Sequence, residues 1–480
     1  MKVCFVVEGS YPYVMGGVSS WVHNMIRMFP DVEFAIAAVI PDRSYRGRFV
    51  YELPENVSEV YEIYLNDKDW ISSKKKRFLS DKDYAPLRSL VMDQQVDWDG
   101  VFRFFERKKH SLNDLLMGED FLSIVTALYD RDYPEISFTD FLWTLRSVYL
   151  PLFQVLGADI PKADIYHCVA TGYAGIVGCL AQHKYNGKLI LSEHGIYTRE
   201  REEELIQAEW VKGIYKDIWI NLFRKMSQVV YDRADRVVSL FEHARELQIE
   251  LGCPKEKTQI IPNGIDPALF AELPGKTEDE QDFVNIGAFV RIAPIKDIKT
   301  LIQAFSAAKK QAPELKLWIM GPDTEDLEYA QECYDYVEYF QVQDVVFTGR
   351  INTCEYMGRM DATILTSISE GQPMTILEGF AAHKMTIATD VGNCRGLIYG
   401  EDDDSLGEAG ILTHVMNVEE IAAAMIFVAK NREKARSMGE TGYRRLMRRY
   451  QLRDMRSAYA GLYRSMGEEL GLKWQESESN

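Results

Sequence analysis

The amino-acid sequence predicts an α/β protein made of two successive doubly wound lobes, with a mostly helical insertion in the first lobe. Short apolar runs alternate with helical patterns along the chain, which is the signal for parallel sheets covered by helices. The alternation stops at residues 271–281, a polar stretch that contains Pro and Gly, and then restarts. A chain of 480 residues is also long enough for two or three domains.

The first lobe is expected to span residues 1–275. Its strand-like runs are residues 3–7, 34–40, 165–169, 189–192 and 237–240. Residues 66–160 interrupt these runs with charged and aromatic side chains at helical spacing, such as Trp98, Phe102 and Phe105. We therefore expect residues 66–160 to form a helical insertion.

The second lobe is expected to span residues 276–450. Its strand-like runs are residues 283–289, 317–320, 345–347, 362–365, 386–389 and 410–412. Residues 451–480 are predicted to form a helical segment that packs back on the first lobe, with a disordered acidic tail at 475–480. Ligands of doubly wound sheets bind beyond the carboxyl ends of the strands, so two lobes that face each other place the site in the cleft between them.

The net charge of −18 argues against a nucleic-acid partner, because neutralising phosphates requires an excess of Lys and Arg. The basic run Lys74–Arg77 is typical of a solvated loop, and docking to a membrane or a partner is the alternative. No apolar run approaches the ~18 residues of a membrane span. Glu8 ends the apolar start of the chain and no cleavage site follows, which favours a buried strand over a signal peptide.

The seven cysteines are scattered and form no CxxC pair, which indicates free thiols in a reducing compartment. We therefore expect a cytoplasmic protein. Several Asp-x-Asp strings could hold a divalent ion on a pyrophosphate, but each lies in a polar loop or the insertion and is better explained as solvated turn charges. These strings are Asp67–Asp69, Asp81–Asp83, Asp97–Asp99 and Asp402–Asp404.

Two basic side chains follow the first strand of the second lobe. Arg291 and Lys296 are five residues apart, directly after the run 283–289, and could clamp two phosphates from one side. As an isolated pair they are more often solvated surface charges.

The segment from the strand-like run at 362–365 through the turn at Gly371 contains the strongest candidates for ligand binding in the second lobe. The run 362–365 leads into a turn at Gly371, and a helix is expected to begin near Pro373 or Met374. Free amides of this turn would point at an anion or at sugar hydroxyls. Glu370 and Glu378 could accept hydrogen bonds from vicinal diols, although a capping carboxylate and an exposed helix charge are the plainer interpretations.

The first lobe offers two further candidates at strand ends. Gly16 and Gly17 follow the first strand and would let the backbone approach a ligand, although a plain βα turn needs them as well. Gly9, Gly16 and Gly17 do not have the GxGxxG spacing of a dinucleotide site. His194 follows the run 189–192, where a ligand of the sheet should lie; an isolated His is otherwise usually structural.

These motifs together resemble the retaining glycosyltransferases of family 4, which have the GT-B fold. The resemblance rests on Glu-x7-Glu at 370–378, on Arg-x4-Lys at 291–296, and on the strings at 261–266, 346–350 and 389–392. It covers residues 1 to about 450, the insertion excepted. The string 193–202, the insertion and residues 294–297 are similar to the PelF-type transferases of Pel exopolysaccharide synthesis.

The resemblance implies metal-independent transfer of a hexosyl unit from a UDP-sugar to a growing polysaccharide, with no cofactor. It implies catalytic roles for His194, Arg291, Lys296 and Glu370. The implied donor-binding residues are Gly16, Gly17, Arg291, Lys296, Arg350, Glu370, Gly371, Gln372, Pro373, Met374, Thr375 and Glu378. It also implies a membrane-embedded Pel-type complex as a partner, which would recruit the protein to the inner face of the membrane.

One position departs from the family pattern. Many relatives have Gly immediately before the phosphate-binding Arg, whereas this chain has Val290, with the nearest glycine at Gly287. Two other functions stay open: a GT-B-type sugar-nucleotide epimerase, and a non-catalytic docking subunit of a secretion complex. The sequence leaves the sugar, the base, the acceptor and the linkage open.

Overall fold

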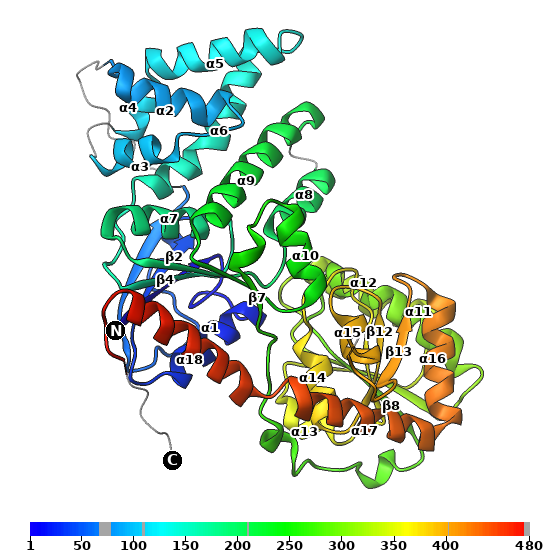
Figure 1. Cartoon of the computed structure of the whole chain (residues 1–480). Coiled ribbons are helices and arrows are strands. Elements are labelled where there is room, and N and C mark those ends of the chain that lie inside the picture. Colours follow the sequence, from blue (N-terminus) through cyan, green and yellow to red (C-terminus); the bar gives the residue numbers. More distant parts are fainter. Residues whose placement is uncertain (67–77, 108–110, 209–210, 402, 475–480) are drawn as a thin grey trace. The chain divides into compact units, whose positions relative to one another are not determined.

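The computed structural model describes residues 1–66, 78–107, 111–208, 211–401 and 403–474 (Figure 1). The Asp67–Asp69 string, the basic run at 74–77 and the tail at 475–480 lie outside these residues, as does Asp402. The chain forms two compact units, Met1–Ile260 with the C-terminal segment from Tyr459, and Ile261–Ala458. Each unit is built on a parallel sheet surrounded by helices, which confirms the predicted fold class.

The first sheet has seven parallel strands in the order β3-β2-β1-β4-β5-β6-β7. Their bounds are β1 Lys2–Glu8, β2 Glu33–Ile40, β3 Val57–Tyr64, β4 Ile165–Cys168, β5 Lys188–Ser192, β6 Arg236–Ser239 and β7 Thr258–Ile260. The strand order reverses beside β1, which pairs with β2 on one side and with β4 on the other. In such sheets the reversal opens a crevice at the carboxyl ends of the strands, where ligands bind.

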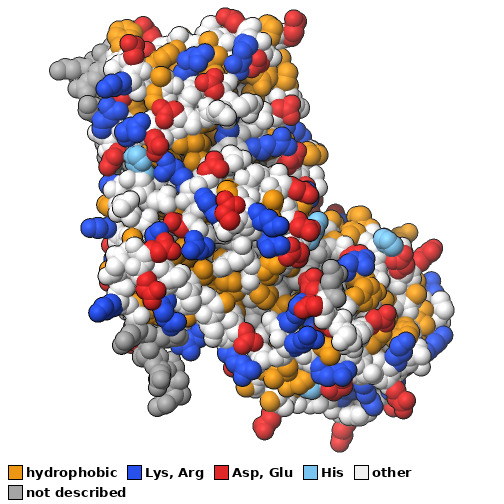
Figure 2. Space-filling view, in the orientation of Figure 1, with side chains coloured by type: hydrophobic (Ala, Val, Ile, Leu, Met, Phe, Trp, Pro, Cys, Tyr) orange, Lys and Arg blue, Asp and Glu red, His pale blue; other side chains and the backbone are white. Residues whose placement is uncertain are grey.

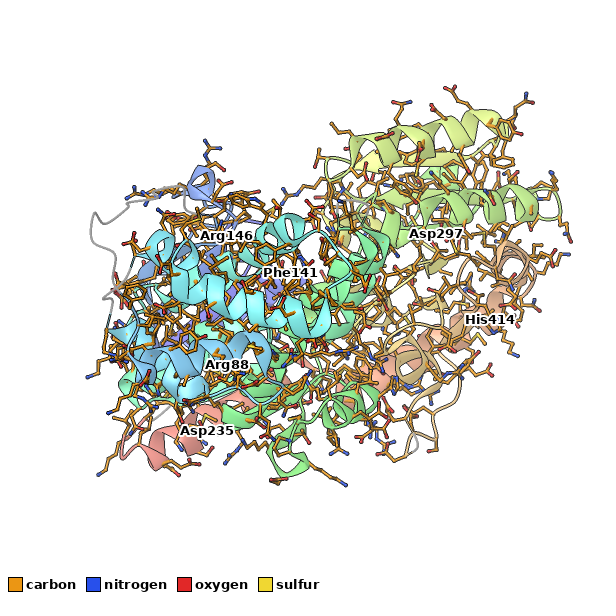
Figure 3. The ribbon with its side chains drawn as sticks, turned by 90° about the horizontal axis from the view of Figure 1, so that it is seen from above. Arg88, Phe141, Arg146, Asp235, Asp297 and His414 are labelled. Atoms are coloured by element: carbon orange, nitrogen blue, oxygen red, sulfur yellow. The ribbon has the colours of Figure 1, made fainter. Side chains whose placement is uncertain are left out.

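Five helices accompany this sheet: α1 Gly17–Met28, α7 Tyr173–Tyr185, α8 Tyr197–Gln207, α9 Gly213–Arg233 and α10 Glu242–Glu250. The insertion forms α2 Asp81–Met92, α3 Trp98–Glu106, α4 Leu112–Leu116, α5 Glu119–Asp132 and α6 Phe138–Leu156. Its helices gather at one end of the unit (Figure 1). They share an aromatic core with rings such as Phe102 and Phe141, the latter labelled in Figure 3. The helical spacing of aromatic residues thus reflects burial among helices.

The second sheet has six parallel strands in the order β10-β9-β8-β11-β12-β13. Their bounds are β8 Val284–Phe289, β9 Leu315–Met320, β10 Val345–Gly349, β11 Ala362–Leu365, β12 Met385–Thr389 and β13 Gly410–Thr413. The helices are α11 Ile298–Lys309, α12 Leu327–Tyr339, α13 Thr353–Met357, α14 Met374–Ala381, α15 Cys394–Tyr399, α16 Val418–Lys430 and α17 Arg432–Arg449. The order again reverses beside β8, between β9 and β11.

The division between the units falls earlier than the boundary expected at residue 275. Residues 261–281 are bound to the second unit, since Ile265 N donates to Tyr450 O at 2.9 Å and Lys276 forms an ion pair with Asp361 at 2.5 Å. The polar composition of this stretch therefore marks a segment that is held on the surface of the second unit.

The last helix, α18 Leu452–Glu469, contains the second boundary between the units. In the first unit its Tyr463 hydroxyl bonds Nδ1 of His167 at 2.8 Å, and its Tyr459 hydroxyl lies 3.0 Å from Oγ of Ser192. His167 Nε2 lies 2.7 Å from the same Ser192 hydroxyl. This buried polar chain fixes the C-terminal part of the helix beside β4 and β5.

All seven cysteines are free thiols. Among the described residues no helix is long and apolar enough to cross a membrane. On the visible face of each unit, Lys and Arg side chains are interspersed with Asp and Glu (Figure 2).

Candidate functional site

The carboxyl end of the second sheet brings several of the predicted residues together. Arg291 and Lys296 follow β8, Arg350 follows β10, and Glu370 follows β11. Because β8 lies between β9 and β11, its following segment borders the turns after both of these strands. Arg350 is exposed, and none of the described residues binds its side chain.

The segments after β8 and β11 are tied together through their backbones. Ile368 N donates to Ile295 O at 2.9 Å, and the Thr366 hydroxyl donates to Lys296 O at 3.0 Å. Asp297, labelled in Figure 3, caps α11 by accepting a hydrogen bond from Thr300 N. The position of Lys296 is thus fixed from both sides.

Lys296 and Glu370 form a direct ion pair, with Lys296 Nζ 2.5 Å from Glu370 Oε1. Their side chains are 16% and 12% exposed, and the Ser367 hydroxyl donates to the same carboxylate oxygen at 2.5 Å. A cation and a carboxylate predicted separately from the sequence therefore meet in one half-buried cluster. Such a pair can present positive charge to a phosphate and carboxylate oxygen to a sugar hydroxyl.

Arg291 forms an ion pair with Glu325, which follows β9. Both side chains are more than 40% exposed, so this pair contributes little to the stability of the fold. The guanidinium is thereby held beside the sheet end and can exchange its partner for an anionic ligand.

The backbone of Val290 packs closely against a glycine that follows the neighbouring strand β9. Gly321 follows β9 with a φ of +156°, and a Cβ placed there would lie 2.0 Å from Val290 O. A glycine is thus required at residue 321 so that the two backbones can come together, and Val290 N donates to Met320 O at 2.9 Å. The tight approach uses a glycine that is distant in sequence from Arg291.

The turn after β11 leads into α14, which begins at Met374 with Pro373 as its N-cap. The first turn of any helix leaves backbone amides without intrahelical partners, so amides at Met374 and Thr375 are available to an anion. Asn393 N donates to Gly371 O at 2.8 Å. Gly392, with a φ of +53°, packs where a Cβ would lie 2.2 Å from Glu370 O. The turn is therefore supported from behind by the segment after β12.

The Gln372 side chain is directed into the fold. Its Oε1 accepts a hydrogen bond from Asn263 N at 2.7 Å, and its residue is 6% exposed. Nε2 of Gln372 and Oδ1 of Asn263 are buried without a partner among the described residues. The side-chain oxygen of Gln372 thus anchors the turn to the string at 261–266, and the predicted donor contacts of this turn are those of its backbone amides.

Glu378 occupies the second turn of α14 as a half-buried carboxylate. Burial raises its pKa to about 7. None of the described residues donates a hydrogen bond to this carboxylate or forms an ion pair with it. A carboxylate left in this state is an acceptor for ligand hydroxyl groups.

In the first unit, Gly16 is the N-cap of α1 and Gly17 is its first residue. Gly16 has an extended backbone, and a Cβ built at either position would meet nothing within 4 Å. The internal packing of the chain therefore gives no reason for glycine here.

His194 follows β5, and burial lowers its pKa to about 4. It is therefore a neutral imidazole at neutral pH. Its Nε2 is buried without a partner among the described residues, and its ring packs edge-on against Trp21 with centroids 4.5 Å apart. A neutral ring nitrogen in this state is available to a ligand hydroxyl group.

Two carboxylates at strand ends of the first unit, Glu193 after β5 and Glu8 at the end of β1, were not identified as site residues from the sequence. Glu193 is 3% exposed and accepts hydrogen bonds from Tyr231 OH and Gln248 Nε2, each at 2.9 Å. Burial raises its pKa to about 7, although these hydrogen bonds act to lower it. Tyr197 connects both carboxylates, because its amide donates to Glu193 Oε1 at 3.2 Å and its hydroxyl to Glu8 Oε1 at 2.8 Å. For Glu193, the sequence signal that could have identified it is its position directly after the apolar strand at 189–192, beside His194.

The described residues contain no group of three or more His, Cys, Asp or Glu side chains placed to hold a metal ion. The phosphate-binding candidates in the second unit are two cations and a helix N-terminus.

Two family models match this chain. The model described as "Glycosyl transferases group 1" matches residues 272–445, and the model described as "Domain of unknown function (DUF3492)" matches residues 1–256. The two parallel-sheet units have the GT-B fold, which the solved structures below share. The chain belongs to the family described as DUF3492, joined to a glycosyl transferases group 1 domain.

Two relatives are glycosyltransferases. The chain is 24% identical to the D-inositol 3-phosphate glycosyltransferase of Kineococcus radiotolerans over 45% of its own length and 54% of the relative's. It thus spans about half of that relative. It is 23% identical to an uncharacterized glycosyltransferase of Methanocaldococcus jannaschii, over 60% of this chain and 72% of the relative.

Solved structures share the fold. Anabaena HepE in complex with UDP-glucose is 14% identical with a TM-score of 0.60, covering 97% of this chain and 100% of that one. Sucrose-phosphate synthase from Thermosynechococcus elongatus is 14% identical with a TM-score of 0.62, covering 98% and 99%. At this level of identity the likeness establishes the GT-B fold.

Proposed function

We propose that this protein is a retaining glycosyltransferase that moves a hexosyl unit from a UDP-sugar to a growing polysaccharide of the Pel type. The observation that carries the proposal is the Lys296–Glu370 pair at the carboxyl end of the second sheet, beside the start of α14. The UDP-glucose complex of HepE, a protein of the same fold, supports the choice of donor.

Positive charge at this sheet end would stabilise the departing diphosphate. Lys296 and Arg291 supply two cations, and the amides at the start of α14 add the positive end of a helix dipole. Fixed donors aimed at developing negative charge are usually the largest catalytic term in such sites. We therefore propose transfer that needs no metal ion.

The two acidic residues of the turn and helix would bind hydroxyl groups of the donor. Glu378 has free carboxylate oxygens that suit the vicinal diol of the ribose. Glu370, held by Lys296 and Ser367, would orient the sugar through its remaining acceptor positions. Arg350, exposed after β10, would add a further cation near the nucleotide.

The first unit offers further groups that would bind the sugar. The amides of Gly16 and Gly17 would meet the distal phosphate and the sugar, and His194 would bind a sugar hydroxyl as a neutral imidazole. In the proposed same-face reaction, the bond from the anomeric carbon to the diphosphate breaks and the new bond to the acceptor oxygen forms on the same face. The leaving diphosphate takes the bonding electron pair and the proton of the acceptor hydroxyl.

Lys296 and Lys299 offer a matched test of the proposal. Both are lysines paired with a glutamate, Lys296 with Glu370 and Lys299 with Glu332 on α12. With labelled UDP-hexoses and an oligosaccharide acceptor, Lys296→Met should lower kcat/KM by about 10²-fold, the scale of losing one charge-stabilising group. Lys299→Met should turn over like the wild type.

The same assay separates the alternatives. Conversion of the donor sugar without acceptor, with the sugar still bound to UDP, would identify an epimerase. An intact protein that neither transfers nor converts any labelled UDP-hexose would contradict the proposal.

We also propose that a membrane-embedded Pel-type synthesis complex recruits the protein to the inner face of the membrane. The insertion supports this part of the proposal, because it lies outside both sheets and exposes apolar side chains such as Trp143 (56%) and Met117 (53%). Loss of co-sedimentation with membranes on Trp143→Ser, with transfer in solution unchanged, is the expected result. Unchanged co-sedimentation of Trp143→Ser would contradict the proposal that the insertion binds the membrane complex.

A further inference from the structure

The loop between β1 and α1 has a buried middle and an exposed end. This glycine loop, residues 9–16, exposes Val14 (44%) and Met15 (43%) just before Gly16. Tyr13, directly before them, is only 5% exposed. The conformation of the exposed end therefore depends on what holds Tyr13.

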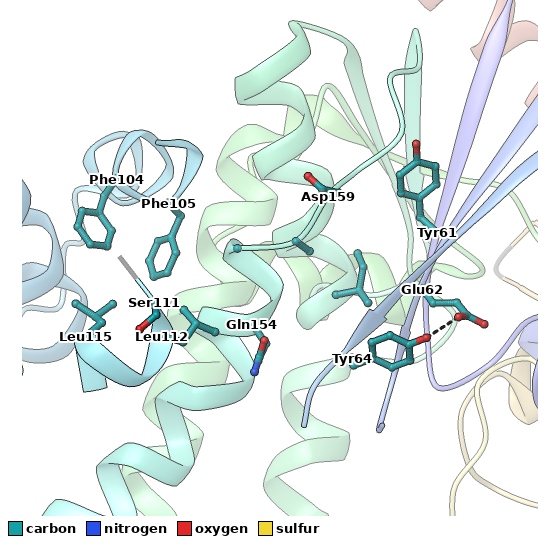
Figure 4. Close-up of a pocket in the computed structure, with 13 residues that line it drawn as sticks. Tyr61, Glu62, Tyr64, Phe104, Phe105, Ser111, Leu112, Leu115, Gln154 and Asp159 are labelled. Atoms are coloured by element: carbon teal, nitrogen blue, oxygen red, sulfur yellow. Dashed lines mark hydrogen bonds between the residues drawn. The ribbon is translucent and has the colours of Figure 1, made fainter. Parts of the chain in front are cut away.

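Tyr13 is held by a carboxylate on the edge strand β3. Its hydroxyl donates to Glu62 Oε1 at 2.6 Å, and Gly47 N donates to the same oxygen at 2.7 Å. The other oxygen, Oε2, accepts from the Tyr64 hydroxyl at 2.6 Å (Figure 4). One side chain thus joins the glycine loop, the segment around Gly47 and the edge strand.

The carboxylate of Glu62 is ionised at neutral pH. Burial raises the pKa of Glu62, but the hydrogen bonds from Tyr13, Tyr64 and Gly47 outweigh burial and hold the pKa below its usual range. Hydrogen bonds to an ionised acceptor are about twice as strong as neutral ones. The link to Tyr13 is therefore a strong restraint on the loop.

Packing reinforces the same link. The Tyr13 ring contacts Phe49 edge-on, with centroids 5.3 Å apart, and Val50 N donates to Pro12 O at 2.9 Å. These contacts fix the first half of the loop, and Gly16 follows Tyr13 by only three residues. The link thus restrains the residues that lead directly into Gly16 and Gly17.

We propose that Glu62 is a positioning residue of the transfer reaction: through Tyr13 it fixes the glycine loop so that the amides of Gly16 and Gly17 meet the donor. The inference rests on the proposed function, because that function places the donor against these amides. Glu62 does not touch the substrate, and its effect passes through the loop.

Tyr64 supplies a matched control. It donates to the same carboxylate as Tyr13, at the same distance of 2.6 Å, but it belongs to β3 and not to the loop. Tyr64 borders a cavity of about 460 Å³ between β3 and helices α3, α4 and α6 (Figure 4). Tyr64→Phe therefore removes one hydrogen bond from Glu62 on the side away from the loop.

The test compares Tyr13→Phe, Glu62→Ala and Tyr64→Phe in the full chain. Hydrogen exchange of residues 9–17, UDP affinity by calorimetry, and kcat and KM for transfer are measured. Tyr13→Phe and Glu62→Ala should speed exchange in the loop and lower kcat, each by about tenfold or more, the scale of losing a hydrogen bond to a charged group. Their UDP affinity should stay within about twofold, since the nucleotide contacts of the proposal lie in the second unit. Tyr64→Phe should match the wild type in all three measurements.

Glu62→Gln retains an oxygen that can accept from Tyr13, so it should recover part of the lost kcat. Wild-type exchange and kcat in Tyr13→Phe would overturn the inference. An equal defect in Tyr64→Phe would overturn it too, because the effect would then come from the whole strand. If the wild type transfers no hexose at all, the proposed function fails, while loop exchange in Tyr13→Phe still decides whether Glu62 holds the loop.

Discussion

Glu378→Gln should make the unliganded protein more stable while weakening its binding of UDP. Burial raises the pKa of Glu378 from the ordinary value of 4.5 to about 7. This difference of about 2.5 units corresponds to about 3 kcal/mol at ~1.4 kcal/mol per unit. The folded state holds the proton more tightly than the unfolded state, so the wild type loses stability as pH rises from 4.5 through 7.

The glutamine side chain cannot ionise and avoids this loss. The stability advantage of Glu378→Gln should therefore be small at pH 5 and grow by about 2.5 kcal/mol by pH 8. Urea unfolding at pH 5, 6, 7 and 8 measures it. Glu338→Gln, at an exposed position of α12, is the control and should show no such trend.

The same substitution should weaken UDP about tenfold or more, because a hydrogen bond to a charged group contributes about 1.5–3 kcal/mol. Calorimetry at pH 8 measures this effect. A stability difference that stays flat between pH 5 and pH 8 would refute the account of Glu378 as a carboxylate buried without a partner. Unchanged UDP affinity of Glu378→Gln would contradict the proposal that Glu378 binds the ribose.

Five further predictions concern the site residues and the stability of the second unit. Because Glu378 must be ionised to accept two hydrogen bonds, wild-type UDP affinity should fall as pH drops below about 7, and a flat profile by calorimetry from pH 8 to 6 would contradict this. Arg291→Ala should lower kcat/KM by about 10²-fold yet unfold like the wild type, since its ion pair is exposed; near-normal kinetics would leave it a surface charge. His194→Ala should abolish most transfer while UDP affinity stays nearly unchanged, and a large loss of UDP affinity would remove its assignment to the sugar. Arg445→Ala should cost about 3–5 kcal/mol in urea unfolding, because it leaves the buried Asp404 without its 2.6 Å partner; a loss below about 1 kcal/mol would contradict that role. Transfer should also survive excess chelator, and activity restored only by magnesium or manganese would refute charge neutralisation by Lys296.

Much of the fold could be predicted because buried parallel strands are continuous apolar runs. The runs at 3–7 and 34–40 are β1 and β2, each almost completely buried. The edge strand β3 escaped notice because its sequence, VSEVYEIY, alternates polar residues on a half-exposed strand. β7 escaped because it has only three residues.

Within the site, the sequence indicated the chemical groups but not their partners. Lys296 and Glu370 were both identified, yet their direct contact depends on β8 and β11 being adjacent in the sheet. Arg291 likewise meets Glu325 because β8 and β9, the strands that precede them, are adjacent in the sheet. Motif spacing carries information only along the chain, so contacts between neighbouring strand ends require the strand order.

The support of the glycine loop could not be predicted for a related reason. Tyr13 and Glu62 are 49 residues apart in sequence, and Glu62 stands on the strand whose pattern was missed. The need for glycine at residue 321 likewise follows from its close approach to Val290, which the sequence does not show.

The open space at Gly17 means that glycine at this position lowers the stability of helix α1 relative to alanine. Alanine is favoured over glycine by about 1 kcal/mol inside a helix, and no atom within 4 Å would oppose the extra methyl group. On the proposed role of the Gly17 amide, chains selected only for thermal resistance should therefore drift to alanine here and lose sugar transfer without losing abundance. Cells that carry Gly17→Ala would still contain the folded protein. A phenotype that needs only the folded protein could therefore be distinguished from one that needs its catalytic activity.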